Sequence, residues 1–151
     1  MKVALFSGSV YGAAEDVARH LVKLLEAAGH QCYYHPRGDL AALLASQPDA
    51  LIGITSTTGM GELPDNLLPF YSELRDQLPT PLRGLPGGVI GLGDSSYSDS
   101  FCGGGELLAE LFDELGIRQI TPMLRLDASE SVTPETDAEP WLAEFMQRLE
   151  H

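Results

Sequence analysis

The chain has 151 residues, of which 44% are hydrophobic and 21% charged, as expected for one soluble domain over residues 1–151. Its net charge of −13 argues against a nucleic-acid partner, because phosphate neutralisation needs clustered Lys and Arg side chains. No apolar run approaches the ~18 residues of a membrane span, and the first predicted strand begins too early to leave room for a secretory signal. We therefore expect a cytoplasmic protein.

The first part of the chain alternates short apolar runs with amphipathic helical patterns. Apolar residues at 14, 17, 18, 21, 25 and 28 lie on one face of a helix, which Gly29 ends. In chain order we predict a strand over 2–6, this helix, a strand over 31–35, a short helix over 39–46 and a strand over 50–55.

The same alternation continues to the end of the chain. Asp65 is the predicted N-cap of a helix that presents Leu67, Phe70, Tyr71, Leu74 and Leu78. In chain order we predict this helix, a strand over 88–93, a helix over 107–115 closed by Gly116, a strand over 117–124 and a last helix over 141–149.

This order of elements predicts an α/β fold. Five strand–helix units with short connections favour a doubly wound, five-stranded parallel sheet of order 2-1-3-4-5 with helices on both faces. In such sheets a ligand binds beyond the carboxyl ends of the strands, where the strand order reverses. The candidate site therefore consists of the loops after the first, third and fourth strands.

The first of these loops is rich in small and hydroxyl-bearing residues and leads into a helix, whose N–H groups and dipole can bind a phosphate. It has neither Lys nor Arg, so a phosphate would be held by neutral donors alone. It matches neither the Walker loop nor the dinucleotide fingerprint. The alternative is a tight turn that needs small residues. The candidate phosphate-binding residues are Ser7, Ser9, Val10, Tyr11, Gly12 and Ala13.

The second loop, residues 56–66, has no apolar periodicity and contains two glycines. Long loops in compact domains are often functional, and glycine allows backbone conformations that other residues avoid. The alternative is a flexible surface loop. The candidate binding residues here are Ser56, Thr57, Thr58, Gly59 and Gly61.

The third loop, residues 93–103, has two aromatic residues among small polar ones. Tyr97 is placed to stack on a planar ligand, whereas we expect Phe101 to pack beneath the loop. The candidate residues are Gly93, Asp94, Tyr97, Phe101 and Cys102. A phosphate-binding loop, a glycine-rich loop and an aromatic side chain at one edge together predict flavin mononucleotide (FMN).

At these residues the chain resembles the flavodoxins over essentially its whole length, and it looks most like short-chain bacterial flavodoxins of the MioC type. The resemblance is carried by residues 7–12, 56–66, 91–97 and 101–103. It implies non-covalent FMN, with residues 7–13 around the phosphate, 56–61 at the reactive edge of the ring and the backbone of 93–102 at its pyrimidine end. It also implies that Tyr97 stacks on the ring. The Gly59 carbonyl would accept a hydrogen bond from protonated flavin N5, which favours the neutral semiquinone.

The chain also departs from the family pattern. Ala13 and Ala14 stand where many flavodoxins have Asn and Thr, which implies weaker FMN binding. Thr58 stands where relatives place an aromatic residue or His, and one extra residue separates Tyr97 from Phe101.

The resemblance implies a single-electron carrier between an NAD(P)H-dependent flavodoxin reductase and acceptor enzymes, and a monomer is the simplest expectation. The charge of −13 predicts an acidic face that steers a basic partner protein. The sequence contains no catalytic constellation and no metal-ligand spacing, so we expect neither substrate turnover nor a metal. Two alternatives stay open, namely an FMN-dependent quinone or azo reductase on the same fold and a binding protein without its flavin.

Overall fold

The structure is a computed structural model that describes residues 1–9, 11–58, 61–93, 102–127 and 133–150. The strands are β1 (Lys2–Gly8), β2 (Gln31–His35), β3 (Ala50–Thr55), β4 (Pro86–Gly93), β5 (Arg118–Gln119) and β6 (Leu124–Asp127). The helices are α1 (Ala13–Ala27), α2 (Leu40–Ser46), α3 (Leu68–Gln77), α4 (Gly103–Leu115), α5 (Pro134–Asp137) and α6 (Glu139–Leu149), with a 3-10 turn at Thr80–Leu82. Among the described residues, no helix is long and apolar enough to cross a membrane.

The strands form one parallel sheet of order β2-β1-β3-β4-β5, in which β6 also pairs with β4. The predicted α/β fold and strand order are therefore confirmed. β1 lies between β2 and β3, so the chain reverses its winding direction around β1. The loops after β1 and β3 lie on neighbouring strands at this point.

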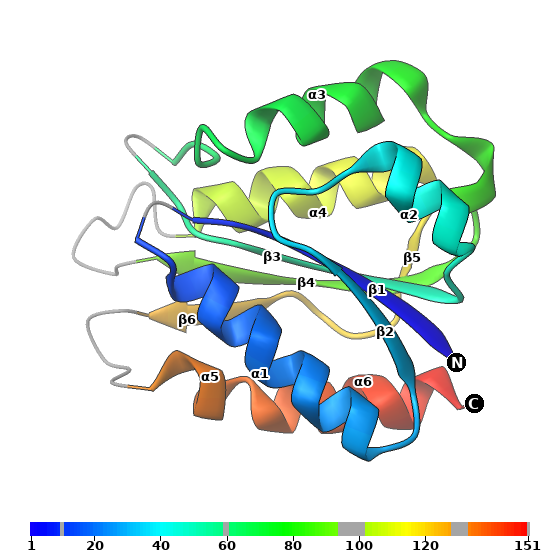
Figure 1. Cartoon of the computed structure of the whole chain (residues 1–151). Helices are drawn as coiled ribbons and strands as arrows, with labels where there is room; N and C mark the ends of the chain where they lie inside the picture. The colour runs from blue at the N-terminus through cyan, green and yellow to red at the C-terminus, as the bar shows by residue number, and fades with distance from the viewer. Residues whose placement is uncertain (10, 59–60, 94–101, 128–132, 151) are drawn as a thin grey trace.

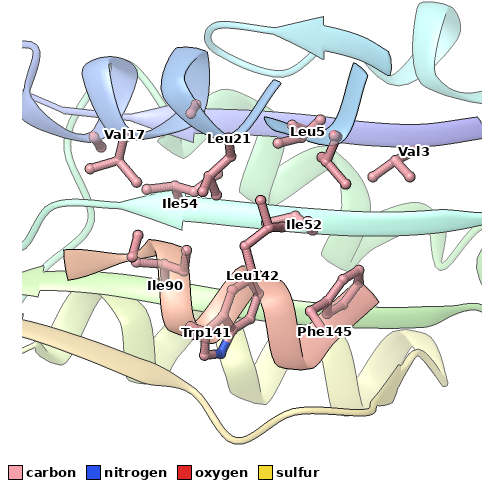
Figure 2. Close-up of a cluster of buried hydrophobic side chains, with 14 of the residues drawn as sticks. Val3, Leu5, Val17, Leu21, Ile52, Ile54, Ile90, Trp141, Leu142 and Phe145 are labelled. Carbon is pink, nitrogen blue, oxygen red and sulfur yellow. The ribbon is translucent and has the colours of Figure 1, made fainter. Parts of the chain in front are cut away.

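Helices cover both faces of the sheet, with α1, α5 and α6 on one side and α2, α3 and α4 on the other (Figure 1). Figure 2 shows part of the first core, where Leu21 of α1 and Trp141 of α6 point toward Ile52 and Ile90 of the sheet. The second core gathers around Phe6, whose ring packs edge-on against Phe70 of α3 with ring centroids 4.9 Å apart. Strands β3 and β4 are buried on both faces, which explains their nearly continuous apolar runs.

The predicted strand over 117–124 is wrong in its bounds, because only Arg118–Gln119 (β5) forms a strand there and an extra strand, β6, begins at Leu124 and runs to Asp127. Gly87 and Ile90 lie three residues apart on β4, whereas their partners Gln119 and Leu124 lie five residues apart, so this edge carries two extra residues. Pro122 lies within the extra segment and has no N–H to donate to the ladder. Its carbonyl accepts a 2.9 Å hydrogen bond from Trp141 Nε1, which ties the interruption to α6.

The predicted N-cap of α3 is also wrong. The helix begins at Leu68 after Leu67, with no side-chain cap, and Asp65 lies one turn earlier. The carbonyl of Pro64 accepts from the backbone N–H groups of Leu67 and Leu68, so a backbone turn replaces the expected side-chain cap. Leu78 follows the helix in a left-handed conformation with 44% of its surface exposed, so it does not join the apolar face.

Candidate functional site

Strands β1, β3 and β4 end at the same edge of the sheet (Figure 1). The ladder between β1 and β3 continues to Gly8 and Thr55, and the Ser56 N–H then donates to the Gly8 carbonyl at 2.9 Å. β1 is therefore two residues longer than predicted, and Ser7 and Gly8 belong to the strand rather than to the loop. The loops after β1 and β3 start side by side as a consequence.

The loop after β1 turns sharply into α1. Gly12 is the N-cap of α1 and adopts a left-handed conformation with φ of 86°, which glycine accepts without a steric cost. Ser9 Oγ accepts a hydrogen bond from the Gly12 N–H at 3.0 Å, so the hydroxyl hydrogen of Ser9 stays free to donate. The N–H groups of the first helical residues, beginning with Ala13, have no intrahelical acceptor. These groups form a compact set of neutral donors at the positive end of the helix dipole.

Ser7 has a different place from the other residues predicted in this loop. Its side chain is buried, and its Oγ donates to the Pro36 carbonyl at 3.0 Å and lies 2.6 Å from Tyr34 Oη. Because the single Ser7 hydrogen goes to Pro36, Tyr34 supplies the hydrogen of the second bond. Burial raises the pKa of Tyr34, which keeps this phenol protonated as that bond requires. Ser7 thus connects β1 to the end of β2.

Beyond β2 the chain makes a tight turn at the same edge. The Gly38 N–H donates to the His35 carbonyl at 3.0 Å, with Pro36 and Arg37 between them, and a proline at the second position is typical of such turns. A pocket of about 690 Å³ separates this turn from the loop after β1. Its wall includes Ser9, Gly12, His35, Arg37 and Asn66.

Asn66, just before α3, connects the loop after β1 to the other side of the sheet edge. Its Nδ2 donates to the Ser9 carbonyl at 2.9 Å. Tyr11 projects from the same loop with 97% of its surface exposed. The Ser9 backbone is therefore held from outside the loop, whereas the Tyr11 ring is free of the protein surface.

The loop after β3 uses its polar side chains internally. Thr57 Oγ1 accepts from the Gly104 N–H of α4 at 3.1 Å, and the hydroxyl of Thr58 lies 3.3 Å from the carbonyls of Glu62 and Leu63. Thr58 and Glu62 also form an antiparallel bridge, closed by Gly61 with φ of 96°. This loop is a small folded-back unit that packs on α4.

The start of α4 is pressed against that unit. A side chain at Gly103 would place its Cβ 2.7 Å from Gly61 Cα, and one at Gly104 would place it 2.5 Å from the Ser56 carbonyl oxygen. Cys102, the N-cap of α4, is fully buried, and its Sγ lies 3.4 Å from the Gly91 carbonyl oxygen. Burial raises the pKa of the Cys102 thiol to about 11, so the thiol is protonated at neutral pH.

The structure therefore brings together Ser9, Tyr11, Gly12 and Ala13 in one loop and Ser56, Thr57, Thr58, Gly61, Gly93 and Cys102 around the ends of β3 and β4. Five predicted site residues lie outside the described residues, namely Val10, Gly59, Asp94, Tyr97 and Phe101. The stacking expected of Tyr97 and the hydrogen bond expected of the Gly59 carbonyl stay predictions for that reason.

Sequence reasoning missed His35 and Arg37, because it considered only the loops after strands one, three and four. The predicted strand order 2-1-3-4-5 could have indicated these two residues. β2 is the direct neighbour of β1, so a turn that follows β2 must lie beside the loop that follows β1. Arg37 follows the predicted end of strand two by two residues.

Comparison with known proteins agrees with this architecture. Residues 5–141 match the family model described as flavodoxin. A Pseudomonas aeruginosa protein described as uncharacterised is 68% identical over 149 residues, which cover 99% of both chains. Flavodoxin YqcA of Escherichia coli is 36% identical over 144 residues, which cover 95% of both chains.

A solved structure is similar as well. A cysteine-to-alanine mutant of flavodoxin from Pseudomonas aeruginosa superimposes with a TM-score of 0.95 at 66% identity, and the match covers 100% of both chains. The family model spans most of this chain, and the relatives cover it nearly from end to end. The chain belongs to the flavodoxin family, the FMN-binding electron carriers.

Proposed function

We propose that residues 1–151 form one FMN-binding domain that carries single electrons from an NAD(P)H-dependent reductase to acceptor enzymes. The observation that carries this proposal is the unused donor set at the start of α1, which lies beside the folded-back loop after β3. Bound FMN supplies the redox chemistry, while the protein binds and orients it.

The phosphate end of the site fits FMN in its donor chemistry. The Ser9 hydroxyl and the N–H groups that begin with Ala13 donate hydrogen bonds without a charge, and the dipole of α1 favours an anion at this point. Ser7 acts here as a positioning residue, because its hydroxyl is engaged by Pro36 and Tyr34. In this proposal Val10, Tyr11 and Gly12 complete the loop around the phosphate.

The ring end of the site is formed mainly by backbone. Ser56, Thr57, Thr58 and Gly61 lie on one side, and Gly93 and Cys102 lie at the ends of β4 and of the segment before α4. Because Thr57 Oγ1 accepts from the Gly104 N–H and the Thr58 hydroxyl lies against the carbonyls of Glu62 and Leu63, we propose that both side chains fix the shape of the loop. Gly59, Asp94, Tyr97 and Phe101 belong to the proposed ring site on the resemblance alone.

We propose that partners dock over the same edge. Asp16, Glu62 and Asp65 are exposed in or next to the loops at this edge, and Tyr11 of the loop after β1 is exposed as well. In a chain of net charge −13, these carboxylates would attract a basic partner surface and raise the association rate. The proposed carrier acts as a cytoplasmic monomer.

We propose further that the protein turns over no substrate of its own. Cys102 is the one cysteine of the proposed ring site, but its thiol is buried and its pKa of about 11 keeps it protonated. NAD(P)H oxidation by the purified protein alone would contradict this part of the proposal and favour the quinone or azo reductase.

The proposal is tested by titrating the FMN-free protein with FMN and then titrating the complex with a reductant. We expect one FMN per chain and two separate one-electron midpoint potentials. A failure of FMN to bind would reject the carrier function and favour a binding protein without flavin. A single two-electron step would reject the single-electron role while leaving FMN binding intact.

A further inference from the structure

Arg37 is an exposed cation on the wall of the pocket beside the loop after β1. Within the described residues, its guanidinium takes part in no hydrogen bond or ion pair, whereas Arg19, Arg125 and Arg148 each contact a glutamate. The guanidinium groups of Arg75 and Arg83 also lack such a partner in the described part of the chain, but neither residue lines this pocket. The chain has 22 acidic and nine basic residues, so carboxylates greatly outnumber cations. An arginine that meets none of them at this place points to an anion from outside the chain.

The carboxylates of the same pocket are already engaged elsewhere. Glu15 pairs with Arg19 one turn further along α1. Asp39 caps α2, and its Oδ1 accepts from the Ala42 N–H at 3.0 Å. Neither carboxylate forms an ion pair with Arg37, although Glu15, Arg37 and Asp39 all line the same pocket.

The backbone of Arg37 is held in place. It occupies the tip of the turn closed by the Gly38 N–H and the His35 carbonyl, and the preceding carbonyl, that of Pro36, accepts from the buried Ser7 hydroxyl. Gly38 adopts φ of 80°, and a Cβ there would lie 2.2 Å from the Phe70 ring, so the turn rests directly on α3. The backbone that carries the Arg37 side chain is thus fixed on the far wall of the pocket from the loop after β1.

A second polar group in the pocket wall lacks a partner. The Nε2 atom of His35 is buried and has no hydrogen-bond partner among the described residues. Leaving such an atom unpaired costs free energy unless a bound molecule or water contacts it. On the opposite wall the Ser9 hydroxyl has its hydrogen free, as described above.

We propose that Arg37 is the charged component of phosphate recognition, and that it binds the phosphate monoester of FMN from the β2 side of the pocket while the loop after β1 binds it with neutral donors. This inference rests on the proposed FMN site. It accounts for a loop that has no cation of its own and whose residues Ala13 and Ala14 contribute no polar side chains. The cation comes from the neighbouring strand instead.

The test compares FMN with riboflavin, which has the same ring but lacks the phosphate. Both ligands are titrated in phosphate-free buffer into the wild-type chain, Arg37→Gln, Arg37→Lys and the control Arg83→Gln. Arg83 is also exposed and loses the same charge, but it lies before β4, at the opposite edge of the sheet. Urea unfolding of each FMN-free variant checks that the fold is intact.

We expect Arg37→Gln to weaken FMN binding about 10-fold or more, as for loss of a charge-assisted hydrogen bond, and to leave riboflavin binding unchanged. Arg37→Lys should recover part of the loss, and Arg83→Gln should match the wild type. In the wild-type chain the ratio of FMN affinity to riboflavin affinity should also fall as salt rises from about 0.05 to 0.5 M, because salt ions screen the exposed guanidinium.

FMN affinity within about twofold of wild type in Arg37→Gln would overturn the inference while the proposed function stands. An equal loss for riboflavin would also overturn it, because the effect would then come from the shape of the site. Failure of the wild-type chain to bind FMN at all would reject the proposed function and this inference together.

Discussion

The two helices that begin at the carboxyl edge, α1 and α4, share a local design and differ in what surrounds them. Each follows a residue in the left-handed conformation, Gly12 or Cys102, and near each start a hydroxyl accepts from a backbone N–H. The start of α1 opens onto a pocket of about 690 Å³, whereas the start of α4 is in backbone contact with the loop after β3. The same local motif therefore faces an open pocket at the start of α1 and is closely packed at the start of α4.

The difference is sharpest in the glycines of the two helix starts. Changing Gly104 to Ala would place Cβ 2.5 Å from the Ser56 carbonyl oxygen, which belongs to backbone and cannot rotate away. We expect this change to destabilise the FMN-free protein by about 3 kcal/mol, as for an overpacked core. A Cβ at Gly12 would meet no atom within 4 Å among the described residues beyond its chain neighbours. We therefore expect Gly12→Ala to lower the free energy of unfolding only by the strain of the left-handed φ of 86°, about 1 kcal/mol. Urea unfolding measures both, and equal losses would show that the two ends are packed alike.

Alkaline pH should weaken the packed end. The Cys102 thiol ionises at about 11 in the folded chain against an ordinary value of 9.0, so the folded state holds its proton more tightly than the unfolded state does. Its stabilising contribution is complete below pH 9 and is lost as the pH rises toward 11, at no more than about 1.4 kcal/mol per pH unit.

The measurement is the free energy of unfolding in urea between pH 8 and 11 for wild type and Cys102→Ala. Cys32 has a similarly raised pKa of about 11 and is present in both proteins, so the difference between the two curves isolates Cys102. We expect the Ala variant to have the shallower decline. Parallel curves would mean that the Cys102 thiol has the same pKa in both states.

The hydroxyls of Ser9 and Thr57, which each accept from a backbone N–H near a helix start, offer a matched pair of substitutions with smaller effects on stability. Thr57→Val leaves the Gly104 N–H without its acceptor in a covered position, and we expect a loss of about 1.5 kcal/mol in unfolding free energy. Ser9→Ala leaves the Gly12 N–H facing a pocket that water enters, so its stability loss should be about 0.5 kcal/mol. FMN affinity should instead fall about 10-fold in Ser9→Ala, with riboflavin affinity unchanged.

Calorimetric titration with both ligands and urea unfolding of both variants complete this comparison. A larger stability loss in Ser9→Ala together with an FMN-specific affinity loss in Thr57→Val would contradict the comparison. It would mean that the start of α1 is the packed end and that the start of α4 binds the phosphate.

Much of the fold follows from local patterns. The bounds predicted for β2 and β3 match the structure, because each is an apolar or β-prone run between turn residues. Prediction failed where the outcome depended on partners far along the chain. The strand predicted over 117–124 stops at Gln119, before Pro122, and a separate strand, β6, begins at Leu124. β1 extends to Gly8 because β3 offers matching partners there.

For the site, the sequence by itself determined the helix-start loop, the glycine-rich loop and the edge of the sheet where they meet, because these depend on strand order and on local backbone preference. Only the tertiary structure decided which polar groups remain available. Ser7 donates to the Pro36 carbonyl and Thr57 accepts from the Gly104 N–H, whereas the Arg37 guanidinium on the pocket wall has no partner in the part of the chain that the structure describes. A hydrogen bond or ion pair between distant segments depends on distance and burial in three dimensions, and neither is encoded in the neighbouring residues.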